Sequence, residues 1–316
     1  SLNDLSDVLI ENTSFNISMY IGHDPSSTTN AANGNIGIGG GLRGALGSIT
    51  TGDRNTAIGT DAANFLTTGL GNTTIGFYSL YSAIGAQDNV AVGRYAQYSN
   101  QYGWYNVALG VRALEDSTWA SNQSLYNVGI GHQAGKNISS GKYNIVIGGE
   151  AGNSGTNDLT TGDNNIIIGY NAAASAATVD NEITLGNSDI TTLRCADTTI
   201  ASLSDRRDKT NIVDSDYGLE FINTLKPRQF TWQTREKVTS KDGKTRIGFI
   251  AQELQEAMPN NENEVLDLVY ESNPERLEIR QGNLLPIIVQ YLKELKETND
   301  ELRKSCNEIY EKIKEL

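Results

Sequence analysis

A serine and a lysine, Ser204 and Lys209, stand five residues apart in a strongly charged stretch of the chain. A serine hydroxyl is a weak nucleophile until a base takes its proton. Lysine can act as that base when desolvation or a neighbouring cation favours its neutral form. The two arginines between them favour that form, and the two aspartates oppose it. With no histidine nearby in the sequence, Ser204 and Lys209 are candidates for a nucleophile and its base. The alternative is that Ser204 and Asp205 cap a turn or a helix.

Three further blocks follow this stretch in order along the chain. The four blocks are Ser204–Ile212, Leu225–Trp232, Ile247–Glu253 and Asn283–Ile288. Together they resemble the intramolecular chaperone auto-processing domain at the C-termini of phage tailspikes and tail fibres, which begins Ser-Asp-x-Arg-x-Lys-x-Asn-Ile. The resemblance covers residues 204–316. It implies a homotrimer and self-cleavage between Leu203 and Ser204, with Ser204 as nucleophile and Lys209 as base. The supporting motif residues that it implies are Asp205, Arg207, Asn211, Gly248, Gln252 and Glu253.

The composition changes sharply just before Ser204. Residues 1–203 hold 28 of the 32 glycines and 23 charged residues, whereas residues 204–316 hold 4 glycines and 40 charged residues. Such a shift marks a domain boundary near residue 200. We expect a repeat domain over residues 1–190, a β-linker over 191–203 and a chaperone domain over 204–316.

The first half repeats a short motif of Asn, three residues that are mostly apolar or small, and Gly. Its closing glycines fall at positions 22, 39, 59, 76, 93, 110, 131, 148, 169 and 186, and most of the gaps are 17 residues. The first and last copies begin with Ser18 and Glu182 instead of Asn. Apolar residues two apart in a strand point to one face, and the glycine permits a positive φ at a turn. The Asn is expected to bond the backbone of the next coil or to hold its own turn.

These features predict a β-solenoid, because a single repeat cannot bury its apolar face whereas stacked coils can. The repeat resembles the left-handed parallel β-roll heads of trimeric autotransporter adhesins and repeat segments of phage tail fibres. Each coil offers only two or three apolar residues, so three rolls packed side by side would bury more. We therefore expect a mainly β, homotrimeric first half and an α+β second half.

A heptad pattern runs without a break along residues 284–316. Its seam positions are Leu285, Ile288, Leu292, Leu295, Asn299, Leu302, Cys306, Ile309, Ile313 and Leu316. Spacings that alternate between three and four are typical of a coiled coil, and a polar Asn in the seam fixes register. The second half is therefore expected to end in a long coiled-coil helix.

The bulk composition excludes several classes of function. The net charge of −13 argues against a nucleic-acid partner, which requires a basic surface. No run of 18 apolar residues is present, so membrane insertion is not expected. Two cysteines and two histidines far apart in the sequence give no pattern for a metal site, and no cofactor is expected.

The sequence favours a virion tail fibre or receptor-binding protein whose chaperone domain is released after cleavage. A cell-surface glycan or a protein is the expected host receptor. Clustered aromatics between Phe77 and Tyr105 could stack on sugar rings or pack between coils and chains. The alternatives are a trimeric adhesin and a polysaccharide depolymerase, which needs two suitably spaced carboxylates. The local acids are Glu115, Asp116, Glu150, Asp158 and Asp163.

Overall fold

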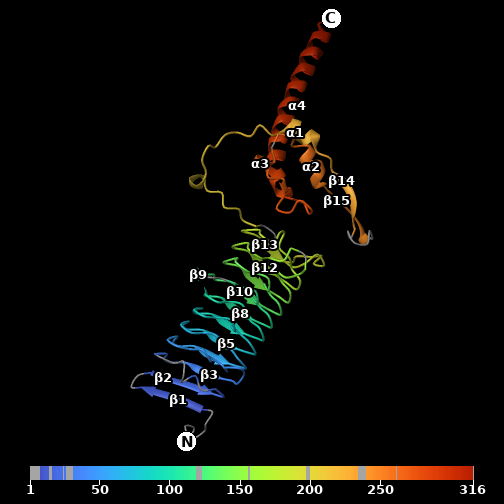
Figure 1. Ribbon diagram of the computed structural model, residues 1–316. Coiled ribbons are helices and arrows are strands. Elements are labelled where there is room, and N and C mark those ends of the chain that lie inside the picture. The colour runs from blue at the N-terminus through green and yellow to red at the C-terminus, as the bar shows by residue number, and fades with distance from the viewer. Residues whose placement is uncertain are drawn as a thin grey trace. The chain divides into compact units, whose positions relative to one another are not determined.

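The chain forms two compact units, Ser1–Cys195 and Ala196–Leu316 (Figure 1). The division falls inside the segment 191–203 that was expected as a linker. The computed structural model describes residues 8–13, 16–23, 25, 31–118, 123–155, 157–196, 200–233, 240–260 and 262–315.

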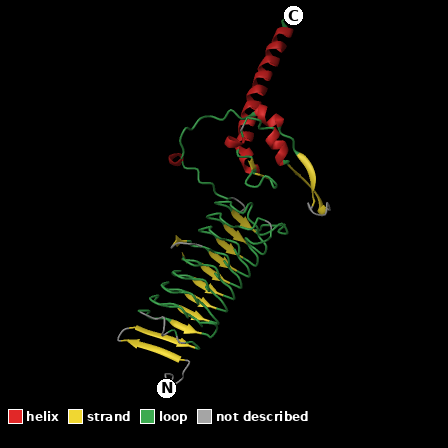
Figure 2. Ribbon diagram, viewed as in Figure 1, coloured by secondary structure: helices red, strands yellow, loops and turns green. Residues whose placement is uncertain are grey.

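The first unit is a β-solenoid with one flat parallel sheet along its length (Figure 2). An antiparallel hairpin of β1 (Val8–Thr13) and β2 (Asn16–Ile21) opens the sheet, and nine strands of three residues then pair in parallel. These strands are β3 (Ile36–Ile38), β4 (Thr56–Ile58), β5 (Thr73–Ile75), β6 (Val90–Val92), β8 (Val107–Leu109), β10 (Val128–Ile130), β11 (Ile145–Ile147), β12 (Ile166–Ile168) and β13 (Ile183–Leu185). Two short strands, β7 (Gly103–Trp104) and β9 (Gln123–Ser124), pair beside it. The repeat prediction is therefore confirmed, since all ten copies of the motif contribute a strand to one sheet.

A ladder of buried asparagines runs through the solenoid just before the strands. In one rung, Asn72 Nδ2 donates to the backbone oxygen of Ala86 at 2.8 Å, and Asn72 Oδ1 accepts the backbone N–H of Asn89 at 3.1 Å. The ladder begins where Asn35 N–H donates to Ser18 Oγ and ends where Glu182 N–H donates to Asn165 Oδ1. The two variant copies of the motif are thus the ends of the ladder. The expected bonding of each Asn to the next coil is confirmed.

The glycine that closes each strand is required by both conformation and space. Gly59 has φ +136°, and a Cβ atom there would lie 2.6 Å from the backbone oxygen of Gly76 in the next coil. Only glycine meets both conditions without strain.

The first and third residues of each strand share one face, as expected, and in the single chain this is the outer face. The middle residue faces the interior of the coil. In β12, Ile167 is fully buried, whereas Ile168 is 38% exposed. The middle positions hold mostly small residues such as Ala91 and Ala108, and larger side chains from outside the strands, such as Leu66 and Leu80, fill the rest of the interior. Two columns of aliphatic side chains, at the first and third strand positions, therefore lie on the outer face of the sheet.

The β-linker expected over residues 191–203 is not formed in the single chain. The described residues of this segment, 191–196 and 200–203, carry no strand and are exposed. A strand needs a neighbour to satisfy its backbone groups, and the single chain supplies none to this segment.

The second unit is a small α+β domain that ends in a long helix. Its elements are η2 (Arg206–Asp208), α1 (Leu219–Thr224), β14 (Arg228–Gln233), β15 (Ser240–Gly248), α2 (Ala251–Glu256), α3 (Asn263–Leu266), β16 (Val269–Tyr270), β17 (Glu278–Ile279), η3 (Gln281–Asn283) and α4 (Leu284–Lys314). Strands β14 and β15 form an antiparallel hairpin. The long terminal helix is confirmed, and it extends well past the other helices of its unit (Figure 1). No helix among the described residues is both long and apolar enough to span a membrane.

Helix α4 carries two different apolar faces. Leu284 and Ile287 are buried in the core of the unit with Phe221, Leu254 and other side chains. The seam residues lie one position further along, and most of them face solvent. Those exposed are Leu285, Ile288, Leu292, Leu295, Leu302, Ile309 and Ile313. The seam is thus separate from the surface that holds the domain together.

Candidate active site

Ser204 and Lys209 lie together because one turn of 3₁₀ helix separates them. Asp205 caps this turn, η2, by accepting the backbone N–H of Arg207 at 2.8 Å, and the turn closes where Lys209 N–H donates to Arg206 O. The reversal brings Lys209 Nζ to 2.6 Å from Ser204 Oγ, to which it donates a hydrogen bond. The two side chains singled out from the sequence are therefore in direct contact.

Asp205 and Arg207 form a separate pair beside them. The guanidinium of Arg207 donates to both carboxylate oxygens of Asp205, with an Nη2–Oδ2 distance of 2.6 Å. These hydrogen bonds lower the pKa of Asp205 and raise that of Arg207. Arg207 therefore neutralises Asp205, and Arg206 is left as the second cation in the turn.

The bond expected to be cut is open to solvent. Leu203 is 100% exposed, and the described residues from Ile200 to Asp216 are exposed as well. Ser204 and Lys209 are also exposed, so in the single chain neither is removed from water. Removal from water favours the neutral form of a lysine, which a general base requires.

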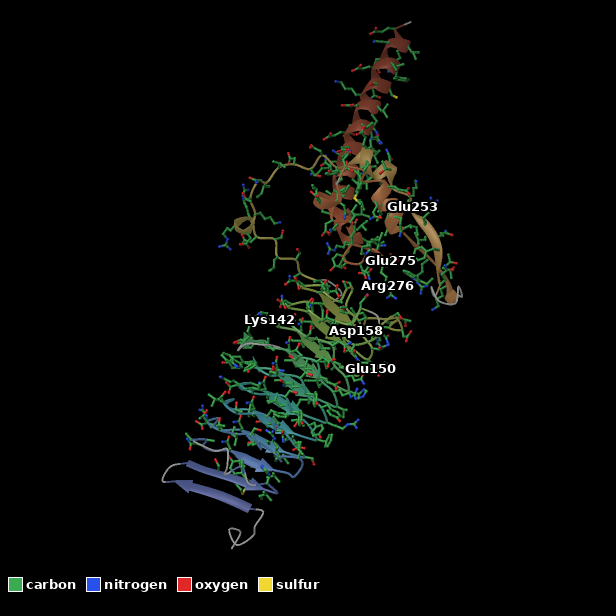
Figure 3. The ribbon with its side chains drawn as sticks, viewed as in Figure 1. Lys142, Glu150, Asp158, Glu253, Glu275 and Arg276 are labelled. Atoms are coloured by element: carbon green, nitrogen blue, oxygen red, sulfur yellow. The ribbon has the colours of Figure 1, made fainter. Side chains whose placement is uncertain are left out.

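The other predicted motif residues have local roles that the structure makes plain. Glu253, labelled on α2 in Figure 3, holds β14 through a two-pronged ion pair with Arg228, whose shortest N–O distance is 2.6 Å. The pair lowers the pKa of Glu253. Gly248 ends β15, and a Cβ atom there would lie 3.0 Å from the ring of Phe230.

Gln252 is exposed on α2, and Asn211 is exposed with φ +53°. No contact found among the described residues joins Asn211, Gly248, Gln252 or Glu253 to the Ser204–Lys209 pair. Sequence reasoning missed Arg228, although it stands in the second block, directly after Pro227.

Two of the five acids considered for glycan hydrolysis hold backbone groups of the solenoid. Asp158 Oδ1 accepts the N–H of Gly155, and Asp163 Oδ1 accepts the N–H of Lys142, each at 2.7 Å. Glu150 and Asp158 lie on the solenoid away from Lys142 (Figure 3). No pair of these acids is brought together as a catalytic site by any contact of the described residues.

Residues 204–261 match the family model of peptidase family S74, described as chaperone of endosialidase. The match begins at Ser204 and covers the candidate dyad, the hairpin and α2. Neither a search of curated proteins nor a search of solved structures found a match.

Proposed function

We propose that this chain is a segment of a homotrimeric phage tail fibre whose C-terminal unit directs trimer assembly and then cuts itself off. The family match and the β-solenoid fit a tail fibre with a C-terminal intramolecular chaperone domain of the serine-peptidase type. The observation that supports the finer proposal is the hydrogen bond between Ser204 and Lys209, at the residue where the match begins.

The reaction is an acyl shift followed by hydrolysis. Ser204 Oγ attacks the carbonyl carbon of Leu203, and Lys209 Nζ takes the hydroxyl proton. The C–N bond between the two residues then breaks, and its nitrogen takes the proton from Lys209 and becomes the free amine of Ser204. This leaves Leu203 as an ester on Ser204 Oγ. Water hydrolyses the ester, which frees the carboxylate of Leu203 and restores the serine hydroxyl.

Assembly is the step that would make Lys209 a base. In the single chain its ammonium is in water, where it donates to the serine instead of accepting from it. We infer that packing of neighbouring subunits around the turn excludes water and favours the neutral amine. Cleavage would then follow assembly, which keeps the chaperone attached until its work is done.

The outer faces described above support a trimer. The seam of α4 is exposed in the single chain although it is apolar, and it is separate from the helix face that packs on its own unit. The solenoid likewise exposes two aliphatic columns on its flat sheet, including Ile36, Ile58, Ile75, Leu109, Ile145 and Ile168, each 36–39% exposed. Joining three chains along these surfaces would bury apolar area that one chain leaves in water.

Cleavage is tested by expressing the chain and weighing its products. We expect a fragment of 113 residues, Ser204–Leu316, and its loss in Ser204→Ala. The mass of the fragment fixes the scissile bond. Full-length wild type with no fragment, or a fragment that persists in Ser204→Ala, contradicts the proposal.

Trimerisation is tested in the uncleaved Ser204→Ala chain by light scattering. We expect a trimer that Leu302→Asp, in the seam, dissociates. The matched control, Lys304→Asp, places the same charge on the outer face of the same helix turn and leaves the trimer intact. A monomeric Ser204→Ala chain, or equal effects of the two substitutions, contradicts the role of the seam.

A further inference from the structure

Six aromatic rings and three guanidiniums form one continuous surface on the solenoid, which we call the aromatic–arginine patch. Its members are Phe65, Phe77, Tyr78, Tyr81, Tyr95, Tyr98, Arg43, Arg94 and Arg112. The rings of Tyr81 and Tyr98 stack at 5.3 Å, and those of Phe77 and Tyr78 at 4.0 Å. Further ring contacts of 4.6–5.7 Å join all six. Arg43 lies over Phe65 at 5.3 Å, and Arg94 and Arg112 lie near Tyr95 at 5.6 and 5.7 Å.

The repeat itself shows that the fold does not require these side chains. The second residue after the closing glycine has a positive φ in coil after coil, and it is Asp61, Gln133, Glu150 and Asn171 in four coils. In the coils between, it is Tyr78 (φ +55°), Tyr95 (φ +60°) and Arg112 (φ +59°). Bulky residues are disfavoured there, whereas Asn and Asp are tolerated. Two tyrosines are therefore held in a strained conformation at a position where other coils use polar residues.

The polar groups of the patch are open to solvent. Tyr78, Tyr81, Tyr95 and Tyr98 are half-buried, and no hydrogen bond of their hydroxyls is found among the described residues. Phe77 and Arg94 are exposed. Arg94 forms no ion pair with any carboxylate in the described part of the chain. The rings and this guanidinium are thus available to a ligand.

The charge of the patch differs from that of the unit around it. Residues 1–203 carry a net charge of −9 and have only 7 basic residues, of which the patch holds three and Lys136 lies in the next coils. Two nearby acids are already engaged. Asp61 is buried and accepts the backbone N–H groups of Leu42, Arg43 and Gly44. Glu115 is shared by Arg112 and Lys136 at 3.8 and 3.9 Å, and burial raises its pKa.

We propose that the aromatic–arginine patch binds a sugar chain that bears carboxylates. Tyrosine rings offer apolar faces to the C–H faces of sugars and hydroxyls to their oxygens. Arginine matches a carboxylate with paired N–H groups. A neutral glycan would use the rings and leave Arg94 without a carboxylate partner, so charge complementarity favours an acidic one. The proposal gives a ligand class and a site to the host receptor expected from the sequence, and it rests on the tail-fibre role proposed above.

The chain offers a matched control on the other flank of the sheet. Tyr126, between Tyr105 and Tyr143 in a separate stacked row, also has a positive φ, of +52°. The residues of this row directly precede the Asn of their motifs, and Lys142 is next to the last of them in the sequence. The patch residues follow the closing glycines instead, and Glu150 occupies an equivalent position in a later coil. Figure 3 shows Lys142 and Glu150 on opposite sides of the solenoid. Asn accepts a positive φ. Tyr95→Asn and Tyr126→Asn therefore make the same substitution at a positive φ, one in the patch and one in the separate row.

The test is calorimetric titration of the purified chain with an octamer of galacturonic acid, and with maltooctaose as a neutral octamer. We expect the acidic octamer to bind at least tenfold more tightly than the neutral one, and more weakly as salt rises. Tyr95→Asn and the double variant Arg94→Gln/Arg112→Gln each reduce the affinity at least tenfold, and Tyr126→Asn changes it less than twofold. Circular dichroism confirms that each variant is folded.

Three results overturn the proposal: no binding of the acidic octamer at millimolar concentration, equal binding of the two octamers, or equal losses in Tyr95→Asn and Tyr126→Asn. If the patch is instead covered by a second copy of the chain, the acidic octamer does not bind and Tyr95→Asn weakens the trimer. Self-cleavage is read separately on a denaturing gel, so failure of glycan binding is distinguishable from failure of the cleavage proposal.

Discussion

At the scale of single residues, the contact between Ser204 and Lys209 is produced by local structure alone. Asp205 caps the 3₁₀ turn, and the turn returns the chain so that the lysine meets the serine at 2.6 Å. The contact needs no distant residue. The residues alone left a capping role open for Ser204, and the family resemblance singled out the pair as nucleophile and base. The environment that would make the lysine a base is not local, because both side chains are exposed in the single chain.

We predict that a positive charge at position 209 is not enough for cleavage, because Lys209 has to accept a proton. Lys209→Arg keeps a cation that donates hydrogen bonds but cannot lose its proton, and Lys209→Gln removes the charge. Both should slow cleavage by about 100-fold or more, the usual worth of a general base. The release of the 113-residue fragment over time measures the rate. Lys226→Gln is the control outside the turn, and normal cleavage by Lys209→Arg would exclude the lysine as base.

At the scale of elements, the asparagine ladder is the main polar device that holds the coils in register. Asn89 Nδ2 donates to the backbone oxygen of Gly103 at 2.8 Å, and Asn89 Oδ1 accepts the backbone N–H of Asn106 at 2.9 Å. Asn106 Nδ2 donates to the same oxygen at 3.1 Å, so two buried donors of Asn106 would be left unsatisfied without Asn89.

Asn89→Ala should therefore destabilise the solenoid by about 3 kcal/mol per chain, the cost of leaving the buried N–H and the buried side-chain amide of Asn106 unpaired. Urea unfolding of the uncleaved Ser204→Ala chain, followed by circular dichroism, measures the change in midpoint. Asn153→Ala removes a side-chain bond to Gln133 in the same unit and should cost less than about 1 kcal/mol. Equal costs for the two variants would show that the ladder is not special.

The sequence could predict those parts of the fold that follow from one repeat. The glycine at each strand end and the asparagine before each strand are set by contacts between neighbouring coils, which the 17-residue spacing already encodes. It could not predict which face of a strand lies inside, because the narrow interior selects the small middle residue such as Ala91. The ion pair between Arg228 and Glu253 could not be predicted either, because 25 residues of chain separate the two.

A contact across 75 residues joins the first and last helices of the second unit. Glu294 on α4 accepts the first N–H of α1, that of Leu219, at 2.6 Å, and also a bond from Gln290. The bond from the Leu219 N–H, followed by the bond from Gln290, lowers the pKa of Glu294. A lowered folded-state pKa stabilises the fold above the usual glutamate range, and the benefit is lost as the pH falls through the lowered value.

Glu294→Gln should therefore lower the melting temperature of the Ser204→Ala chain at pH 7. The gap between this variant and the Ser204→Ala parent should close as the pH falls below the usual range of glutamate. Differential scanning calorimetry across pH 3–7 measures it, with Glu297→Gln as a control one turn along the helix. A gap that stays constant with pH would assign the loss to packing instead of charge.

At the scale of the whole molecule, both units expose apolar surface, the solenoid along its strands and the second unit along α4. The solenoid of one chain buries a core of alanine, leucine and isoleucine side chains, and its strands leave two columns of mostly aliphatic side chains on the outer face. Those columns are spread over nearly the full length of the unit, so the trimer that we propose would require three chains in register. The α4 seam lies within a single helix, and contacts that are local in sequence form faster than long-range sheet contacts. A chaperone of this kind raises the effective concentration of the three shafts.

Removal of the chaperone should therefore make folding irreversible in practice. We predict that the cleaved shaft, residues 1–203, remains trimeric but fails to regain its trimer after urea unfolding and dilution, because the element that aligned the chains is gone. The uncleaved Ser204→Ala chain should refold under the same conditions. Light scattering after refolding compares the two, at matched chain concentration. Stability of the cleaved shaft then rests on its barrier to unfolding. Equal recovery of both trimers would show that the shaft aligns itself, and the second unit would then have no role in assembly.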